Sequence, residues 1–290
     1  MAKYVPGIYN IEGLKMYLDP KKKGICGALL KRGYREPCFM WILRKEARGK
    51  LGVDLGANIG YATMSLCKNM KRVIAIEPDV RCSELLMRSV AANSFQDKVT
   101  LHNFAISDSE GEKDIYLSER YYNLNTLCDV SGVETKLHKF RKGKIFTRTI
   151  DSLNVEPNFI KMDIEGYEVE ALRGGMGTLK RAKKCKLLIE VHPQYYSDER
   201  NFADVVTALY EMGFSIKYLV SAAVPCPDLF KKKGYKPFKV LLDEKHRRGI
   251  FKNVSPKDAL NFCSFRHKQK ISRTGKFSEK IVRSVLFVKG

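Results

Sequence analysis

The sequence lacks several features that would assign it to a specialised class of protein. In 290 residues, no apolar run approaches the roughly 18 residues that suggest a membrane span, and the first residues lack the apolar core of a secretory signal. None of the eight cysteines forms a C-x-x-C pair, which argues against a zinc ribbon or a thioredoxin-like motif. Internal repeats and low-complexity linkers are also missing. We therefore expect a cytoplasmic globular protein with reduced thiols, built as one enlarged domain rather than two.

Negative charge is scarce toward both ends of the chain. The net charge of +21 divides into +7 for residues 1–48, +1 for residues 49–225 and +13 for residues 226–290. Basic flanking segments of this kind suit a polyanionic partner, such as nucleic acid, an anionic lipid surface or a phosphorylated glycan. A solvated basic surface without a partner explains the same composition equally well. Both interpretations stay open.

The middle of the chain alternates between apolar segments and amphipathic ones, which predicts alternating strands and helices. This pattern is typical of an α/β protein whose mostly parallel sheet is covered on both faces. We expect a doubly wound, seven-stranded sheet, a short extra strand at 115–117 and an irregular polar stretch over 118–146. The expected strands are 51–55, 72–76, 99–106, 159–164, 186–191, 214–220 and 281–288, with helices over 61–70, 79–92, 167–182 and 202–212.

Four parts follow from these patterns. A basic helical cap is expected over 1–48, a ligand-binding core over 49–220, a basic insertion over 221–280 and the final strand of the core sheet over 281–290. The insertion has no clear repeat and interleaves basic runs with aromatic residues. Its role is unknown.

The segment from Val53 to Gly60 combines a buried strand, an acid and a glycine turn that opens a helix. A strand, a tight turn and a helix N-terminus together form a place for a nucleotide-like ligand. Gly56 and Gly60 allow positive φ, and Asn58 tolerates the left-handed region better than most residues. A carboxylate at Asp54 would repel a pyrophosphate but favour a cationic amino acid moiety, such as the methionyl ammonium of S-adenosylmethionine. An ordinary strand-to-helix turn is the alternative for this stretch alone.

Further polar residues follow the other strands, at the edge where a doubly wound sheet binds its ligands. Glu77 lies 17 residues after Gly60, where a carboxylate can hydrogen-bond both ribose hydroxyls. Ile106 and Asp108 are suited to flank an adenine and bond its amino group. The turn around Asn58 departs from the dinucleotide pattern G-x-G-x-x-G. Together with the acid before it, this departure favours S-adenosylmethionine over a dinucleotide.

These motifs resemble those of the FkbM-type methyltransferases, class I enzymes that use S-adenosylmethionine. The resemblance extends from about residue 16 to 220 and resumes at the last strand, but it does not cover 221–280. It rests on residues 54–60, 76–78, 103–108, 149–153, 160–168 and 189–193. It implies a Rossmann-like fold and O-methylation of a hydroxyl on a sugar, a glycan or another small molecule. The cofactor-binding residues we predict are Asp54, Gly56, Asn58, Gly60, Glu77, Ile106, Asp108 and Asp163.

Methyl transfer depends mainly on alignment, and a hydroxyl nucleophile also benefits from a general base. We predict His192 or Asp163 as this base and Lys161 as the partner that keeps a carboxylate ionised, with Glu165 as a further catalytic residue. Alternatively, Lys161, Asp163 and Glu165 form a buried ion-pair network that fixes the fourth strand to the following helix. Separately, His192 is alternatively a plain loop histidine.

Three other possibilities stay open. Asp163, Glu165, Glu190 and His192 offer oxygen and imidazole ligands, but no spacing fixes a metal geometry, so we predict no metal. The protein is alternatively an RNA ribose methyltransferase that uses 221–280 as a basic clamp. Exocyclic base methylation is disfavoured because no Asn/Asp-Pro-Pro-Tyr motif is present. The last possibility is a non-catalytic binding module that keeps the cofactor fold.

Overall fold

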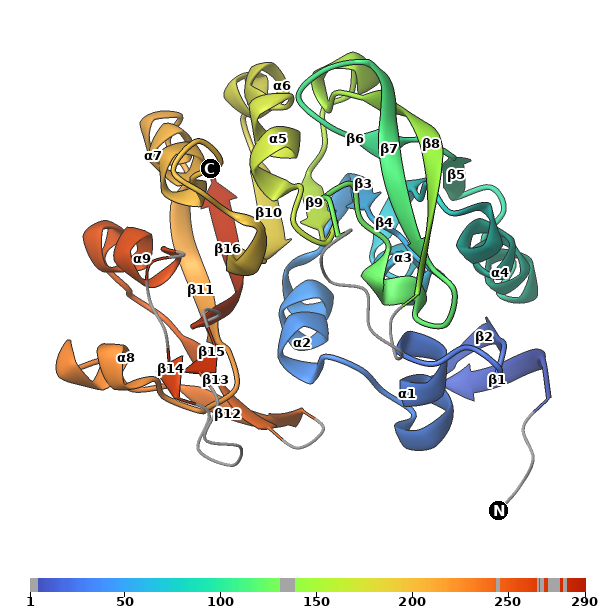
Figure 1. The fold of residues 1–290 in the computed structure, drawn as a ribbon, viewed down its shortest axis with the longest axis horizontal. Coiled ribbons are helices and arrows are strands. Elements are labelled where there is room, and N and C mark those ends of the chain that lie inside the picture. The colour runs from blue at the N-terminus through green and yellow to red at the C-terminus, as the bar shows by residue number, and fades with distance from the viewer. Residues whose placement is uncertain are drawn as a thin grey trace.

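The computed structural model describes residues 5–130, 139–243, 246–264, 266, 269–270, 277–278 and 281–290. Nine strands form one central sheet (Figure 1). They are β3 (Gly49–Leu55), β4 (Met70–Ile76), β5 (Val99–His102), β9 (Phe159–Met162), β10 (Cys185–Glu190), β11 (Ser215–Ser221), β12 (Lys239–Asp243), β13 (His246–Phe251) and β16 (Val282–Lys289). Their order across the sheet is β12-β13-β11-β16-β10-β9-β3-β4-β5.

The seven strands from β11 to β5 form the predicted core. Strands β10, β9, β3, β4 and β5 pair in parallel, while β16 runs antiparallel to both of its neighbours, β10 and β11. This confirms the predicted doubly wound, mostly parallel α/β fold. The basic insertion is not separate from the sheet, however. Its strands β12 and β13 extend the sheet from seven strands to nine, because β13 pairs with the outer strand β11.

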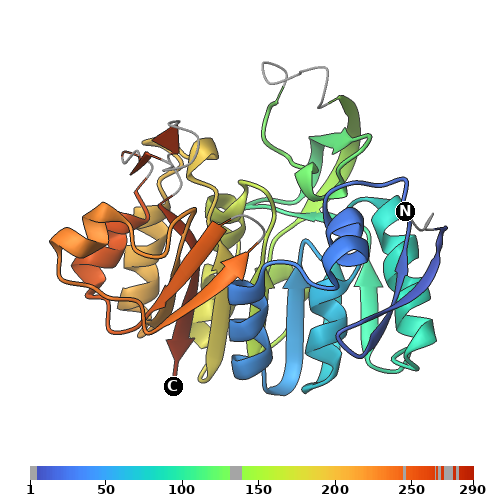
Figure 2. The same ribbon diagram turned by 90° about the horizontal axis from the view of Figure 1, so that it is seen from below.

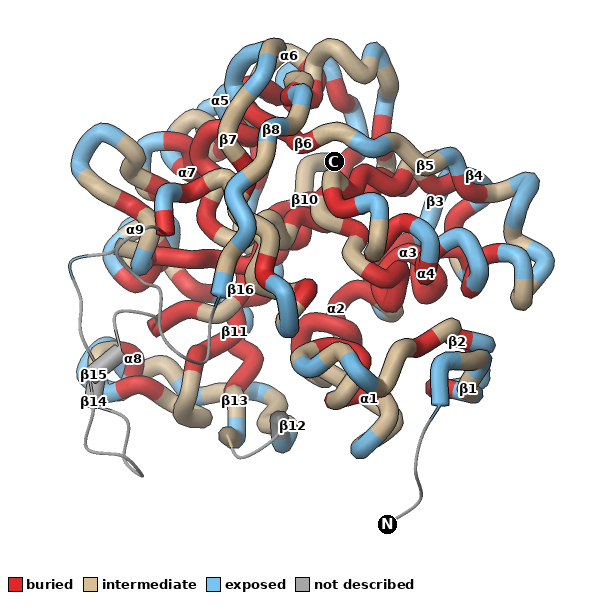
Figure 3. The backbone as a smooth tube through the Cα atoms, turned by 45° about the vertical axis from the view of Figure 1, so that its right-hand side comes forward, coloured by how far each residue is buried: buried red, intermediate tan, exposed pale blue. Residues whose placement is uncertain are grey.

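Helices cover both faces of the sheet and divide the core into two apolar clusters. One face carries α2 (Pro37–Glu46), α3 (Tyr61–Cys67) and α4 (Val80–Ala92). The other carries α5 (Glu168–Arg173), α6 (Met176–Arg181), α7 (Phe202–Glu211), α8 (Asp228–Lys232) and α9 (Pro256–Phe262). Alternation along β10 sends Leu187 and Ile189 into one cluster and Leu188 into the other. Figure 3 shows the resulting concentration of buried residues along the central strands.

The N-terminal segment differs from the expected helical cap. It begins with an antiparallel hairpin, β1 (Gly7–Ile11) and β2 (Leu14–Leu18), before α1 (Ile25–Arg32) and α2. Met16 and Leu18 are buried in the same apolar cluster as α2 and α4. Alternate burial along β2 is the signature of a strand, and the hairpin attaches to α4 where Ser89 Oγ accepts from the Tyr17 amide at 2.8 Å.

The predicted strand over 99–106 divides into two pieces that belong to different sheets. β5 ends at His102, whereas β6 (Ala105–Ile106) pairs with β8 (Phe140–Arg148) in a three-stranded sheet completed by β7 (Gly111–Ser118). The expectation of irregular structure over 118–146 is therefore wrong for its last residues. The β7–β8 hairpin stands above the edge where the parallel strands end (Figure 2). Charged residues interrupt both strands, as in the pairs of Asp114 with Lys142 and Lys144, so the sequence shows no clear apolar alternation here.

The predicted helix over 167–182 breaks into α5 and α6 at Gly174-Gly175. A Cβ on Gly174 would lie 2.2 Å from the carbonyl oxygen of Ser107, so this glycine lets the segment after β6 approach the helix. A further short antiparallel pair, β14 (Gln269–Lys270) and β15 (Phe277–Ser278), belongs to the insertion. Among the described helices, none has the length and apolar character to cross a bilayer.

Candidate functional site

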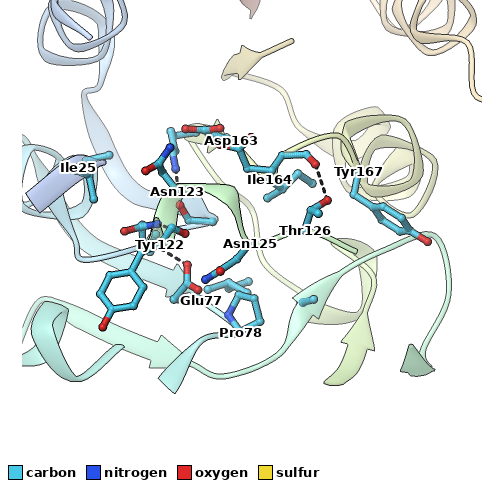
Figure 4. A pocket seen from close by; sticks show the side chains of 18 of the residues that line it. Ile25, Glu77, Pro78, Tyr122, Asn123, Asn125, Thr126, Asp163, Ile164 and Tyr167 are labelled. Atoms are coloured by element: carbon cyan, nitrogen blue, oxygen red, sulfur yellow. Dashed lines mark hydrogen bonds between the residues drawn. The ribbon is translucent and has the colours of Figure 1, made fainter. Parts of the chain in front are cut away.

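A cleft opens at the carboxyl ends of β3, β4 and β9 (Figure 4). The segment that links α1 to α2 forms one wall, and the chain between β7 and β8 forms another. Its polar and charged lining residues are Arg35, Glu36, Asn58, Glu77, Asn123, Asn125, Thr126, Lys161, Asp163 and Glu165, and its apolar ones include Ile25, Phe39, Met40, Ile76, Phe104, Ile106 and Ile115.

The turn after β3 shapes the floor of the cleft. Gly56 has φ +75°, and a Cβ there would lie 2.0 Å from the carbonyl oxygen of Asp163, so only glycine fits. Asn58 has φ +51°, and its Nδ2 donates to the carbonyl oxygen of Tyr122 at 3.0 Å, which ties the wall between β7 and β8 to the turn. Gly60 does not line the cleft; its backbone packs against Leu86 of α4. Two of the three predicted turn residues thus face the site.

Glu77 ends β4 with its carboxylate at the cleft. Oε2 accepts the Asn58 amide at 2.7 Å and Oε1 accepts the Asp79 amide at 2.9 Å, so the side chain is fixed in orientation. Only 4% of the residue is exposed, and burial raises the pKa of Glu77 to about 7. The structure places this residue where the sequence predicted a ribose-binding carboxylate.

Asp54 is not on the cleft wall. Its Oδ1 lies 3.0 Å from Lys161 Nζ, Thr63 Oγ1 donates to its Oδ2 at 2.6 Å, and the residue is fully buried. Lys161 also donates to the carbonyl oxygen of Gly56 at 2.7 Å. Asp54 is not among the described residues that line the cleft, and its contact with a ligand ammonium stays a prediction. Its carboxylate neutralises Lys161, and together they hold the Gly56 turn against β9.

The two residues predicted to flank an adenine are separated. Ile106 is buried and lines the cleft, beside Phe104 and Ala105. Asp108 lies beyond it, where its side chain is 40% exposed and accepts from the hydroxyls of Ser107 and Ser109 at 2.9 and 3.1 Å. Strand β6 ends at Ile106, so the chain turns away before Asp108 reaches the cleft.

An acidic cluster surrounds His192 next to the cleft. Asp163 and Glu165 line the cleft, while His192 lies behind them and is 2% exposed. His192 Nδ1 is 2.9 Å from Glu168 Oε1, and its Nε2 is 3.2 Å from Glu190 and 3.4 Å from Glu165. The same Nε2 lies 3.9 Å from Asp163 Oδ1. The imidazole is thus a link among carboxylates rather than a plain loop side chain.

The charges of this cluster are only partly balanced. Arg283 of β16 donates to Glu190 at 2.8 Å and to Glu36 at 2.5 Å. Burial and the nearby Glu190 carboxylate raise the pKa of Asp163. Burial acts against ionisation of Glu168 too, but its bond with His192 holds the pKa of Glu168 below its usual value. A site with a fixed anion behind the imidazole and a weakly acidic carboxyl in front of it can accept and hold a proton.

The same cluster offers metal-ligand atoms. One atom each from Asp163, Glu165 and His192 lies within 4.8 Å of the others, and so does a second trio of Glu36, Asp163 and Glu190. Arg283 already supplies a cation to the second trio. The first trio has suitable donors for a divalent ion.

The residues that form two walls of the cleft were not among the predicted site residues. Arg35, Glu36, Phe39 and Met40 come from the segment before and within α2, and the signal that could have found them was the family resemblance, which already begins at about residue 16. The chain over 122–127 gave no signal, because it reads as polar and irregular. Thr126 in this wall donates to the carbonyl oxygen of Glu165 at 2.7 Å, which places it against the acidic cluster (Figure 4).

Comparison with known proteins identifies the family to which this chain belongs. Solved structures with similar folds include methyltransferase FkbM from Methylobacillus flagellatus KT, 18% identical, with a TM-score of 0.41 over 83% of this chain and 44% of that one. The present chain thus spans less than half of that protein. A putative RNA methyltransferase from Pyrococcus horikoshii is 12% identical, with a TM-score of 0.39 over 93% of each chain. No curated protein matches the sequence. Residues 54–216, more than half of the chain, match the methyltransferase FkbM domain, and the protein therefore belongs to the FkbM methyltransferase family.

Proposed function

We propose that the protein is an S-adenosylmethionine-dependent O-methyltransferase that acts on a hydroxyl of a sugar, a glycan or another small molecule. One observation carries the proposal. A buried carboxylate at the end of β4, Glu77, and a proton-accepting cluster at the end of β9, Asp163 and Glu165, face the same cleft. A nucleoside-binding group thereby stands beside groups that can take a proton from a hydroxyl.

The cleft residues fit the nucleoside part of this cofactor. Glu77 is oriented by two backbone amides and can accept hydrogen bonds from both ribose hydroxyls. Phe104 and Ile106 give the apolar surroundings that an adenine ring requires. Gly56 lets the turn lie against the backbone of Asp163, which holds the floor of the cleft in place. When bound, S-adenosylmethionine supplies a methyl group on a positively charged sulfur.

The acidic cluster would serve the acceptor. Glu165 or Asp163 takes the hydroxyl proton, since both side chains line the cleft. His192 acts behind them as a positioning residue, because Glu168 fixes its Nδ1 and leaves its Nε2 directed at Glu165 and Asp163. The buried negative charge of this cluster also favours a cationic sulfonium nearby.

A methyl-transfer screen tests the proposal. The protein is incubated with methyl-labelled S-adenosylmethionine and, separately, with sugars, sugar phosphates, glycans and RNA oligonucleotides. We expect label to enter a hydroxyl of a carbohydrate acceptor and to be lost in Glu165→Gln. Label on RNA ribose alone would instead favour the RNA methyltransferase alternative. If the protein binds S-adenosylmethionine but labels none of the acceptors, the result would favour the non-catalytic binding module.

A further inference from the structure

A second groove adjoins the cofactor cleft and leads away from it across α2. It shares Arg35, Met40 and Tyr61 with the cleft, so the two cavities adjoin along this wall. Its other walls are Glu12, Tyr34, Pro37, Trp41, Arg44, Lys45, Leu241 and Leu242. All of these except Tyr61 lie outside residues 54–216, the part that matches the family domain. The groove is therefore built mostly by residues outside the matched domain.

An aromatic cluster beside the groove holds lysine side chains over its rings. Trp41 packs against Tyr218 and Phe238, with ring centroids 5.8 and 5.9 Å apart. Lys45 Nζ lies 4.6 Å from the centre of the Trp41 ring, and Lys239 Nζ lies 5.5 Å from it. Such contacts restrict the ammonium groups without neutralising them.

Lys252, from the chain just after β13, adds a third ammonium group, 4.2 Å from the centre of the Phe238 ring. Together, Lys45, Lys239 and Lys252 are called the lysine cluster below. Lys217 lies near it but is paired with Glu46 at 2.9 Å. Within the described ranges, no carboxylate forms an ion pair with any of the three members of the lysine cluster. In the groove itself, Glu12 is paired with Arg44, which leaves Lys45 as an unneutralised charge.

The cleft and the groove thus differ in charge. Asp163 and Glu165 line the cleft, Lys45 lines the groove, and Lys239 lies beside the groove over the ring of Trp41. A phosphate would be repelled by the carboxylates and attracted by the ammonium groups, whereas a neutral hydroxyl is tolerated beside a carboxylate that accepts its proton. A molecule that carries both groups would bind in one direction only.

We propose that this groove binds the phosphate group of the methyl acceptor, and that the acceptor is a free sugar phosphate or nucleotide sugar. This inference rests on the proposed methyl-transfer function. The lysine cluster holds the phosphate ester, Arg35 lies on the shared wall between groove and cleft, and the sugar hydroxyl reaches Asp163 and Glu165. Lys45 and Lys252 are exposed and Lys239 is half-buried, but each ammonium group lies over an aromatic ring, so less side-chain entropy is lost on binding than for an unrestricted lysine.

The chain contains its own reporter for the test, since Trp41 is its single tryptophan. The full-length protein is titrated with glucose 1-phosphate, glucose and inorganic phosphate while tryptophan emission is followed, and calorimetry repeats each titration. We expect saturable binding of glucose 1-phosphate, weaker binding of inorganic phosphate and none of glucose. Lys45→Gln and Lys239→Gln should each weaken binding by about fivefold or more. Lys71→Gln, an exposed lysine at the start of β4, is the matched control and should bind as the wild type does.

Two further measurements separate the possible failures. Absence of glucose 1-phosphate binding, or equal affinity in the two lysine variants and the wild type, would overturn the inference. Binding of single-stranded oligouridylate through the same lysines, without binding of glucose 1-phosphate, would overturn it in favour of nucleic acid. S-adenosylmethionine affinity is measured in every variant and should not change. If phosphate binds but S-adenosylmethionine does not, the proposed function fails; if only S-adenosylmethionine binds, the groove assignment fails and the function stands.

Discussion

The ammonium of Lys161 lies 3.0 Å from Oδ1 of Asp54, and both side chains are buried. The pair joins the end of β9 to the end of β3, directly beneath the turn that forms the floor of the cleft. Because Lys161 also donates to the carbonyl oxygens of Leu55 and Gly56, it fixes the backbone of that turn. This role is structural; it differs from the ligand contact predicted for Asp54, and for Lys161 it is close to the predicted alternative of a buried ion pair.

Removal of one partner of this pair should therefore destabilise the fold. Lys161→Met leaves Asp54 as an uncompensated buried charge, which costs about 3–5 kcal/mol. Urea unfolding followed by circular dichroism measures the loss. The double variant Lys161→Met/Asp54→Leu should recover part of it, and Lys50→Met, an exposed lysine on β3, should change little. If Lys161→Met were as stable as the wild type but did not transfer methyl groups, Lys161 would have a direct catalytic role instead.

Two glycines with similar backbone angles should respond differently to alanine. Gly56 has φ +75° and no space for a Cβ, since it would lie 2.0 Å from the carbonyl oxygen of Asp163. Gly213 has φ +86° and nothing within 4 Å of a Cβ. Gly213→Ala should cost only backbone strain of about 1 kcal/mol, whereas Gly56→Ala should also abolish binding of S-adenosylhomocysteine. Thermal shift with and without this ligand gives both quantities. If both variants bound S-adenosylhomocysteine equally well, the Gly56 turn would not be part of the ligand site.

Binding of the cofactor should depend on pH through Glu77. Burial raises the pKa of Glu77 to about 7 in the free protein, and ribose hydroxyls are best accepted by the ionised form. Affinity for S-adenosylhomocysteine should then fall as the pH drops below 7, by up to about tenfold per pH unit. Glu77→Gln should bind more weakly and lose this dependence. Calorimetric titration between pH 5.5 and 8.5 measures the affinity of both proteins. If the wild-type affinity depends on pH as little as that of Glu77→Gln, Glu77 does not bind the ribose as its ionised form.

The same pKa shift has a consequence for stability with the opposite trend. Because the folded protein holds the Glu77 proton more tightly than the unfolded chain, this group adds least to stability above pH 7. Its contribution grows as the pH falls from about 7 toward the ordinary value of 4.5. The free energy of unfolding of Glu77→Gln, compared with the wild type over this range, isolates that contribution. A difference that grew with rising pH in favour of the wild type would contradict the raised pKa.

Replacement of Glu165 and replacement of His192 should differ in their effect on stability. Glu165 faces the cleft, so Glu165→Gln should lower turnover by about a hundredfold with little loss of stability. His192 is buried among four carboxylates, so His192→Ala should lower stability by about 2–4 kcal/mol as well as turnover. Unfolding curves and initial rates on the identified acceptor test both statements. Unchanged turnover in His192→Ala would remove it from the site.

Much of the fold could be predicted because apolar periodicity marks buried strands and helices directly. Glu77 and the Gly56 turn were found for the same reason, since the residue after a parallel strand must lie at the ligand edge. The ion pair of Asp54 could not be predicted, because the sequence does not show that Lys161 lies across from it on the neighbouring strand. The wall over 122–127 is polar and held by contacts such as that of Asn58 with Tyr122, which leave no local pattern. The insertion strands were missed because neither alternates: β12 is a short apolar run over 240–242, and β13 places Arg247, Arg248 and Gly249 before its two apolar residues.

The central claim is that the cleft binds S-adenosylmethionine, and calorimetric titration tests it most directly. The wild type should bind one molecule per chain with saturable heat, Glu77→Gln should bind at least about tenfold more weakly, and Gly213→Ala should match the wild type. Absence of heat and of thermal stabilisation at millimolar S-adenosylmethionine, in a protein that unfolds cooperatively, would contradict the account.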